Sequence, residues 1–371
     1  MIIGVPTEIK NFENRVAITP AGVTDFIRSG HQVIIQAGAG LGSGIVDEEY
    51  LKAGATLVPT PEEVYKPAEL ILKVKEPVDY ELELLRPGQI LFAYLHLAAS
   101  EELTKALLER EVIGIAYETV QLADGTLPLL APMSEVAGSM APQIGAYYLA
   151  RTQGGRGILM GGVAGVEPAN VVVLGGGHVG TRAAMMAAGL GAQVTVLEIA
   201  PARVRYLFET MPKNVKVLQS NQYTIEKTVS RCDLLIGAVL IPGSKAPKLV
   251  TREMLSTMKE RAVMVDVAVD QGGCFETTRP STHEDPVYYV DGILHYAVSN
   301  MPGAYPRTST FALTNATMPY ALKIANKGLV ALREDAALAR GLNLYRGSVT
   351  HLGVAAAFDL PHQAVEKVLV S

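Results

Sequence analysis

Short apolar runs separated by polar and glycine-containing segments recur along the first third of the chain. Several are rich in β-branched and aliphatic side chains and are typical of buried strands. They occupy residues 1–5, 31–36, 70–74, 89–94 and 112–117. Between them, residues 20–29 are predicted to form a helix that stops at Gly30, and Ser100 is predicted to cap a helix that reaches about Arg110. Apolar strands with intervening helices predict an α/β fold with a parallel, doubly wound sheet buried on both faces.

A second series of apolar runs follows in the middle of the chain. A helical pattern over residues 134–149 and a glycine-rich loop over residues 154–167 precede it. The runs predict strands at residues 171–174, 193–197, 216–219, 233–239, 262–269 and 294–298. Six strands with helices between them are the complement of a full dinucleotide-binding fold. From residue 314 to the end the pattern is largely helical, and periodicity does not tell where this tail packs.

A glycine-rich turn joins the first strand of the second series to an alanine-rich helical segment. Gly175, Gly177 and Gly180 have the spacing G-x-G-x-x-G. In such a turn the first glycine permits a tight bend, the second lets the backbone approach a pyrophosphate, and the third lets the helix pack close to the strand. The N–H groups at the start of that helix favour phosphates. Glu198 ends the next predicted strand, about 20 residues further on, where an acid can bind an adenosine ribose. A purely structural glycine turn is the alternative, and the acid at this distance favours a dinucleotide site.

Composition narrows the class of protein. A chain of 371 residues with 49% hydrophobic residues, 35 glycines and no tryptophan suits a two-domain α/β enzyme. The net charge of −5 does not suggest nucleic acid or an anionic membrane as a partner. The longest apolar stretches, such as residues 234–243, are too short to span a membrane, and the N-terminus carries no targeting signal. Cys232 and Cys274 form neither a metal-binding pattern nor a disulfide framework. We therefore expect a cytoplasmic protein without a metal site.

Basic side chains follow three predicted strands of the first domain. Arg15 follows the first strand, Lys75 the strand at 70–74, and His96 the strand at 89–94. Because the carboxyl ends of parallel strands meet at one edge of a sheet, we expect the three groups at one edge. A guanidinium with an ammonium group suits a small carboxylate, and a histidine exchanges protons near neutral pH. The alternatives are solvated strand-end charges for Arg15 and Lys75, and a hydrogen-bonded structural histidine for His96.

Two acids punctuate the predicted strand at residues 262–269 and its end. Burying a carboxylate is costly unless it has partners, so Asp266 is the better candidate for a structural role. Asp270 is expected to end the strand, on the edge where the nicotinamide half of a dinucleotide would lie. The alternative for Asp270 is a turn residue before Gly272 and Gly273.

The opening Gly4-Val5-Pro6-Thr7-Glu8-Ile9-Lys10, with Glu13, Arg15, Val16 and Pro20 after it, resembles a signature of alanine dehydrogenases. The soluble part of proton-translocating transhydrogenase shares that signature, and the resemblance extends over essentially the full chain. Two stretches are more similar to the dehydrogenases: His96-Leu97-Ala98-Ala99, and residues 265–274 with Asp270. The transhydrogenase subunit lacks this pairing of histidine and aspartate and works with a membrane partner.

The resemblance implies two doubly wound, Rossmann-like domains: an NAD-binding domain at residues 131–305 is inserted into a substrate domain made of residues 1–130 and 306–371. It implies a homohexameric enzyme that reversibly converts L-alanine, NAD and water to pyruvate, ammonium and NADH, with no nucleic-acid or membrane partner. In such an enzyme Arg15 and Lys75 bind the substrate, and His96 and Asp270 are catalytic. Whether His96 or Lys75 takes the first proton stays open.

The resemblance also implies a set of cofactor-binding residues at the glycine turn and around it. They are Ser134, Gly175, Gly177, His178, Val179, Gly180, Glu198, Arg203, Ser220, Val239, Leu240, Val267, Ala268, Val269, Asp270, Arg279, Val298, Ser299, Asn300 and Met301. Many relatives have aspartate where this chain has Glu198. Either acid disfavours a ribose 2′-phosphate, so a preference for NAD is expected.

Three other functions compete with this one. A soluble NAD(H)-binding component of a transhydrogenase would have no amino-acid substrate. A saccharopine- or lysine-type dehydrogenase, which shares the pattern of Arg15 and Lys75, would act on a longer amino acid. A non-enzymatic NAD-binding scaffold is disfavoured because the two basic residues, His96 and Asp270 occur together.

Overall fold

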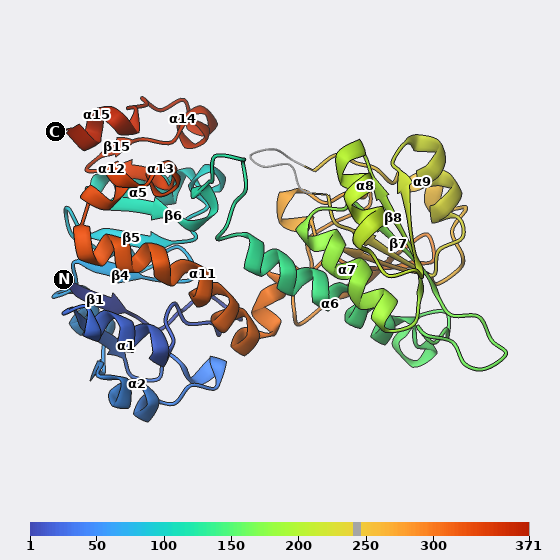
Figure 1. Ribbon diagram of the computed structural model, residues 1–371, viewed down its shortest axis with the longest axis horizontal. Coiled ribbons are helices and arrows are strands. Elements are labelled where there is room, and N and C mark those ends of the chain that lie inside the picture. The colour runs from blue at the N-terminus through green and yellow to red at the C-terminus, as the bar shows by residue number, and fades with distance from the viewer. Residues whose placement is uncertain (240–245, 371) are drawn as a thin grey trace. The chain divides into compact units, whose positions relative to one another are not determined.

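The computed structural model describes residues 1–239 and 246–370, which divide into two compact units (Figure 1). Unit 1 combines Met1–Met133 with Tyr305–Ser371, and unit 2 is Ser134–Ala304. The chain therefore leaves the first unit, builds the second, and returns to complete the first. Leu240, one of the expected cofactor residues, lies outside the described residues, as does the end of the apolar stretch 234–243.

The described residues of unit 1 form an eight-stranded sheet in the order β15-β14-β6-β5-β4-β1-β2-β3. Its strands are β1 (Ile2–Val5), β2 (Gln32–Gln36), β3 (Thr56–Val58), β4 (Leu70–Leu72), β5 (Ile90–Ala93), β6 (Ile113–Ala116), β14 (Leu342–Tyr345) and β15 (Ser348–Val349). The strands β1 to β6 pair in parallel, whereas β14 runs antiparallel to both β6 and β15. Because β1, β4, β5 and β6 are parallel neighbours, the loops after them meet at one edge of the sheet.

In unit 1, capping residues and a glycine mark ends of the two helices that the sequence predicted. The helices of this unit are α1 (Pro20–Arg28), α2 (Asp47–Ala53), α3 (Pro61–Tyr65), α4 (Glu81–Leu84), α5 (Glu101–Glu109), α11 (Pro306–Lys327), α12 (Val330–Glu334), α13 (Ala336–Arg340), α14 (Leu352–Phe358) and α15 (Val365–Val370). Thr19 caps α1, and Gly30 follows that helix with a φ of 82°. Ser100 caps α5 by accepting the N–H of Leu103. Both predicted helices of the first domain are confirmed.

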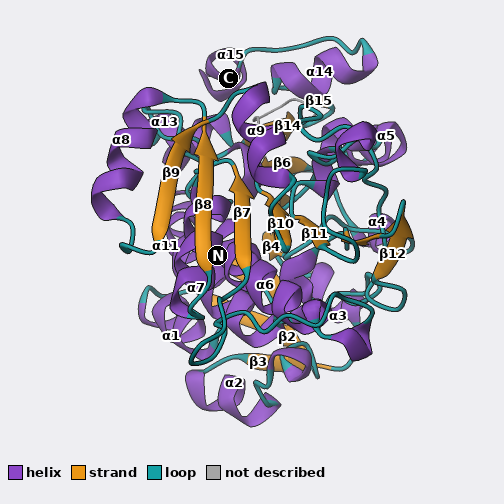
Figure 2. Cartoon of the chain, turned by 90° about the vertical axis from the view of Figure 1, so that its right-hand side faces the viewer, coloured by secondary structure: helices purple, strands orange, loops and turns teal. Residues whose placement is uncertain are grey.

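The described residues of unit 2 form a seven-stranded sheet in the order β12-β13-β11-β10-β7-β8-β9. Its strands are β7 (Asn170–Leu174), β8 (Gln193–Glu198), β9 (Val215–Gln219), β10 (Leu234–Gly237), β11 (Val263–Asp266), β12 (Val287–Val290) and β13 (Ile293–Tyr296). Figure 2 shows β9, β8 and β7 as neighbouring arrows. The helices are α6 (Ala131–Leu149, whose first turn belongs to unit 1), α7 (His178–Gly189), α8 (Pro201–Thr210), α9 (Gln222–Val229) and α10 (Arg252–Leu255).

Apart from β12, the strand order of unit 2 is that of the dinucleotide-binding fold, in which β7 and β10 flank the point where the order reverses. The expected fold class, two doubly wound α/β domains, is confirmed. Each sheet also carries antiparallel strands at one edge, since β12 runs antiparallel to β13.

The structure also corrects several local predictions. The tail after residue 314 is largely helical, as expected, but it also contributes β14 and β15 to the sheet of unit 1. Strands β3 and β12 were not expected. The strand predicted at 262–269 ends at Asp266, so Asp270 does not end a strand but lies in the 3₁₀ turn Val269–Gln271.

None of the helices in residues 1–239 and 246–370 has the length and apolarity needed to cross a membrane.

Candidate active site

The glycine turn of unit 2 has the backbone geometry that its sequence predicts. Gly175 follows β7 with a φ of +93°, and Gly177 is the N-cap of α7. A Cβ atom at Gly180 would lie 1.8 Å from the carbonyl oxygen of Gly175, so any side chain there would force the helix away from the turn. A Cβ atom at Gly177 would meet no atom within 4 Å. The turn thus combines tight packing at Gly180 with open space at the start of α7, where His178 and Val179 begin the helix, and this fits an anionic group.

Glu198 and Arg203 brace this turn. One carboxylate oxygen of Glu198 accepts the N–H of Gly176 at 2.7 Å, and the other accepts the two N–H groups that follow Glu198. Arg203 donates from Nε to the carbonyl oxygen of Gly176 at 2.7 Å and from its guanidinium to Thr181 Oγ1 at 2.8 Å. A carboxylate offers about four lone-pair sites, so Glu198 keeps capacity for a ribose hydroxyl.

Most other expected cofactor residues follow the carboxyl ends of the parallel strands of unit 2. Ser220 follows β9, Val239 follows β10, and residues 267–270 and 298–301 follow β11 and β13, so they gather at the edge that carries the glycine turn. Ser134 lies on α6 and Arg279 on the connection between β11 and β12.

Asp266 and Asp270 have different surroundings. Asp266 is buried and accepts hydrogen bonds from the N–H groups of Ala268, Cys274 and Phe275 and from Thr278 Oγ1. Burial raises the pKa of Asp266, although these hydrogen bonds oppose the rise. Its contacts agree with the structural role expected for it. Asp270 is exposed, and one of its carboxylate oxygens accepts the N–H of Asn300 at 3.3 Å. That bond links the loop after β11 to the loop after β13.

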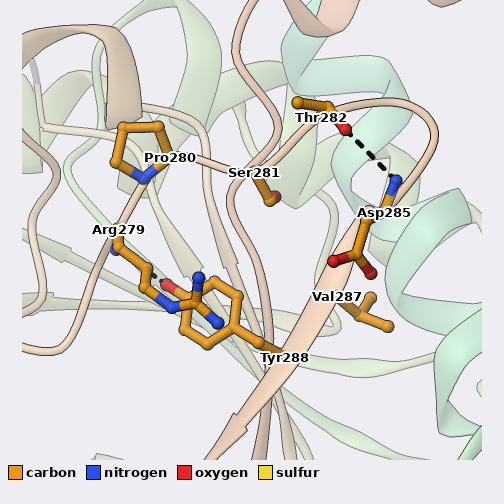
Figure 3. A pocket seen from close by; sticks show the side chains of 7 residues that line it. All are labelled: Arg279, Pro280, Ser281, Thr282, Asp285, Val287 and Tyr288. Atoms are coloured by element: carbon orange, nitrogen blue, oxygen red, sulfur yellow. Dashed lines mark hydrogen bonds between the residues drawn. The ribbon is translucent and has the colours of Figure 1, made fainter.

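Arg279 is held against an aromatic ring. Its guanidinium carbon lies 4.1 Å from the centre of the Tyr288 ring, and its backbone N–H donates to the Tyr288 hydroxyl at 2.8 Å. Figure 3 shows the two side chains together among the residues that line a pocket. This stacking fixes the place of the guanidinium at the edge strand β12.

In unit 1, Arg15 is buried rather than solvated. Its side chain is 2% exposed and makes two hydrogen bonds with the carboxylate of Glu13, at 2.6 and 2.5 Å, and a third contact with Met133 Sδ at 3.1 Å. Burial lowers the pKa of Arg15, but Glu13 outweighs this and leaves the pKa above its usual value. The alternative of a solvated strand-end charge is therefore wrong for Arg15.

Lys75 lies in the electrostatic field of Arg15. The pKa of Lys75 is lowered, first by burial and then by the positive charge of Arg15, while the negative charges of Glu76 and Glu13 oppose the shift. Two positive charges in one partly buried place favour an anion beside them. Arg15 is already paired with Glu13, so the lowered pKa of Lys75 shows that its ammonium charge is unfavourable here, and a further carboxylate beside Lys75 would reduce that cost.

His96 is exposed and has an unusual backbone. It follows β5 with φ 47° and ψ 36°, in the left-handed region. Its ring stacks on that of Tyr94, with centroids 5.9 Å apart and planes 10° from parallel. Burial raises the pKa of Tyr94, and the nearby positive charge of Arg15 opposes this rise. The Tyr94 hydroxyl donates a hydrogen bond to the Leu129 carbonyl oxygen at 2.5 Å. The exposed ring argues against a buried structural histidine. These links bring the groups of Arg15, Lys75 and His96 to one edge of the sheet.

Acids and a lysine to which the sequence interpretation assigned no role support this edge. Glu8 accepts the N–H of Val74 at 2.6 Å and forms a buried ion pair with Lys73 at 3.2 Å. Lys73 also pairs with buried Glu81 at 2.7 Å. Glu118 accepts the N–H of His96 at 2.6 Å. The available signal for Lys73 was a charge inside the apolar run 70–74, which requires a buried partner.

The fold and these two edges define a two-domain α/β protein in which one unit has a dinucleotide-type glycine turn and the other a cluster of basic groups. Family models match both parts: residues 4–137 match "Alanine dehydrogenase/PNT, N-terminal domain", and residues 141–352 match "Alanine dehydrogenase/PNT, C-terminal domain". The chain belongs to the alanine dehydrogenase/PNT family.

Curated relatives and solved structures agree with this membership. The chain is 58% identical over 371 residues to an alanine dehydrogenase of Methanococcus maripaludis, covering 100% of both chains. It is 55% identical over 372 residues to an alanine dehydrogenase of Geobacillus stearothermophilus, again covering 100% of both. A solved L-alanine dehydrogenase is 50% identical with a TM-score of 0.95, covering 97% of this chain and 99% of that one. A transhydrogenase from Sinorhizobium meliloti is 27% identical with a TM-score of 0.82, covering 94% and 100%.

Proposed function

We propose that this protein is an L-alanine dehydrogenase, which reversibly converts L-alanine, NAD and water to pyruvate, ammonium and NADH. The observation that carries the proposal is the gathering of Arg15, Lys75 and His96 at one edge of unit 1, in a chain similar to alanine dehydrogenases along its whole length. We assign residues 1–130 and 306–371 to the substrate and residues 131–305 to NAD. A homohexamer in the cytoplasm is the assembly and location that we propose with this function, on the basis of the family resemblance.

The basic pair is proposed to bind the substrate carboxylate and, in the reverse direction, the carbonyl oxygen. Arg15 is already ordered by Glu13, so little side-chain freedom is lost when an anion binds beside it. The pKa of Lys75 is lowered because burial and the positive charge of Arg15 both disfavour its charged form. A carboxylate bound beside Lys75 would favour the charged form again. Fixing the carboxylate in this way turns the reaction into a positioned, nearly unimolecular step.

The chemistry requires a hydride to leave Cα, a proton to leave the ammonium group, and water to attack the resulting iminium carbon. We propose that His96 carries protons, since its ring is exposed at the edge and an imidazole nitrogen can both accept and donate a proton. Because the pKa of Lys75 is lowered, a larger fraction of its amine is unprotonated than in an ordinary lysine, so Lys75 and His96 both remain candidates for taking the first proton. Asp270, whose carboxylate is exposed in the turn after β11, is proposed to orient the water and stabilise the cationic carbon.

NAD, when bound, supplies the hydride acceptor. The residues proposed to hold it are those of the glycine turn and the strand-end loops of unit 2, with Glu198 at the ribose, together with Ser134, Arg203 and Arg279. The open space at Gly177 and the helix N-terminus after it fit a pyrophosphate. A 2′-phosphate would meet the negative charge of Glu198, which supports the choice of NAD over NADP.

Two variants test the catalytic roles. His96→Ala should bind NADH as the unchanged protein does and lose about 10²- to 10⁴-fold in kcat, the contribution expected of a positioned proton-transfer group. Asp270→Asn should still bind NADH and lose about 10²- to 10³-fold in kcat, the contribution expected of a group that stabilises developing charge. Binding is read from NADH fluorescence and turnover from NADH absorbance. A variant that keeps near-normal kcat removes its residue from the mechanism.

A soluble transhydrogenase component remains the second candidate, because the structure of one is similar at 27% identity. The alanine dehydrogenases at 50–58% identity favour the first candidate. Alanine-dependent NADH formation by the isolated chain separates the two.

A further inference from the structure

The backbone of His96 lies in a conformation that needs external support. With φ 47° and ψ 36° it occupies the left-handed region, which side chains with a Cβ atom adopt only at an energetic cost. Glycine and asparagine, the usual residues there, are absent from the turn Leu95-His96-Leu97. Left-handed residues at active sites persist when the surrounding structure holds them in place.

Glu118 supplies that support. It lies in the 3₁₀ turn Tyr117–Thr119, just after β6, the parallel neighbour of β5. Its Oε1 atom accepts the N–H of His96 at 2.6 Å and the N–H of Leu95 at 3.2 Å, while Oε2 lies 3.3 Å from the same Leu95 nitrogen. Two successive N–H groups therefore point at one carboxylate, and this fixes the peptide plane from which the His96 side chain leaves.

The same arrangement recurs one strand away. Glu8, which follows β1, accepts the N–H groups of Val74 and Lys75, at 2.6 and 3.4 Å, where the chain leaves β4. Both Lys75 and His96 thus follow a parallel strand and are anchored by a carboxylate from the end of the adjacent strand. Repetition at two neighbouring strands points to a common device for placing side chains at this edge.

We propose that Glu118 is a positioning residue for the reaction: by accepting the N–H groups of Leu95 and His96, it holds the His96 ring against Tyr94 in the orientation that proton transfer requires. This inference rests on the proposed function and on the proton-carrying role of His96. Glu118 itself transfers no proton in this account. What it contributes is the geometry of its acceptor oxygen, rather than its negative charge.

Geometry and charge are separated by two conservative variants. Of the two Glu118 carboxylate oxygens, only Oε1 accepts the N–H groups of both Leu95 and His96. In Glu118→Gln the amide oxygen can take the place of Oε1, although the negative charge is lost. In Glu118→Asp the charge stays, but the side chain is one methylene shorter. We expect Glu118→Gln to keep kcat within about 3-fold, and Glu118→Asp to lose about 10- to 100-fold, as a small misplacement of a reacting group does. The reverse order, with aspartate more active than glutamine, would overturn the proposal.

A double-variant comparison tests whether Glu118 acts through His96. Glu118→Asp should reduce kcat strongly in the unchanged protein and by less than about 2-fold in a His96→Ala background, because the group that it places is then missing. Losses that multiply would show that Glu118 acts by another route. Glu69→Gln is the matched control: Glu69 also accepts a backbone N–H, that of Ile2 at 2.8 Å, but at the opposite end of β1. It should leave kcat unchanged.

NADH affinity should stay the same in Glu118→Gln and Glu118→Asp. If Glu118 served stability alone, the thermal unfolding midpoint would fall and the kcat of the folded protein would not change. If the unchanged protein shows no alanine-dependent turnover, the proposed function fails. If it turns over and the two variants behave alike, only the role of Glu118 fails.

Discussion

Replacing Lys73 tests the buried charge network beneath the basic edge of unit 1. The Lys73 side chain is 0% exposed and lies between two carboxylates that are themselves buried, Glu8 at 3.2 Å and Glu81 at 2.7 Å. In Lys73→Met a side chain of similar length fills the space, but both acids lose their positive partner. Removing one partner of a buried ion pair costs about 3–5 kcal/mol. We expect the free energy of unfolding to fall by that amount at neutral pH.

The pH dependence of this loss follows from Glu8. Burial raises the pKa of Glu8 above its usual value of 4.5, and the charge of Lys73 opposes the rise. Without Lys73 the pKa of Glu8 in the folded protein rises further. A folded-state pKa above the unfolded one gives stability that is complete at low pH and is lost as pH rises through the folded value. The destabilisation by Lys73→Met should therefore be larger at neutral pH than near the unfolded pKa of Glu8.

The assay is urea unfolding followed by far-ultraviolet circular dichroism, because the chain contains no tryptophan. Lys105→Met is the control: Lys105 pairs with Glu101 at 2.7 Å, but the two side chains are 56% and 52% exposed. Such a pair contributes about 0.3–0.5 kcal/mol. If Lys73→Met loses no more stability than Lys105→Met, or loses more at low pH than at neutral pH, the reasoning about the buried network is refuted.

Two further predictions concern the cofactor turn and the basic pair. Gly180→Ala places a Cβ atom 1.8 Å from the Gly175 carbonyl oxygen, so it should lower the free energy of unfolding by about 1–3 kcal/mol and weaken NADH binding. The control is Gly189→Ala on the same helix, where a Cβ atom meets nothing within 4 Å and NADH affinity should stay unchanged. Equal NADH affinities of the two variants in a fluorescence titration would contradict this. Lys75→Gln should raise the KM for alanine about 10- to 100-fold, the equivalent of one hydrogen bond to a charged group. Because the pKa of Lys75 is lowered in the folded protein, the charged ammonium reduces the free energy of unfolding at pH values below that pKa. Lys75→Gln removes the charge, so this variant should unfold at a higher urea concentration at neutral pH. A lower urea midpoint for Lys75→Gln would count against the account.

The glycine turn could be predicted from the sequence because its requirements are local. The φ of Gly175 and the close approach at Gly180 depend on residues within one strand, one turn and one helix. The gathering of Arg15, Lys75 and His96 was also predictable, because the order of parallel strands places the loops after them at one edge. The apolar pattern indicated which segments were strands, and the rule for parallel sheets then placed the loops that follow them.

What the sequence did not reveal depends on side-chain contacts that a pattern of apolar and polar residues does not show. The apolar pattern of residues 262–269 is that of one strand. In the structure the Asp266 carboxylate accepts the N–H groups of Ala268 and Cys274, the strand ends at Asp266, and Asp270 lies in the following turn. Strand β14 has only four residues and includes the polar Asn343, so its pairing with β6 is not visible in a hydrophobic pattern. The roles of Lys73 and Glu118 depend likewise on partners that only the folded sheet brings near.

The most direct measurement is NADH formation by the purified chain with L-alanine, with L-lysine and with no amino acid, in the presence of NAD or NADP. The account predicts turnover with L-alanine and NAD, far weaker turnover with NADP because of Glu198, and none with lysine. Absence of turnover with alanine in either direction, while NADH still binds, would contradict the assignment and leave a transhydrogenase component or a binding scaffold as the function.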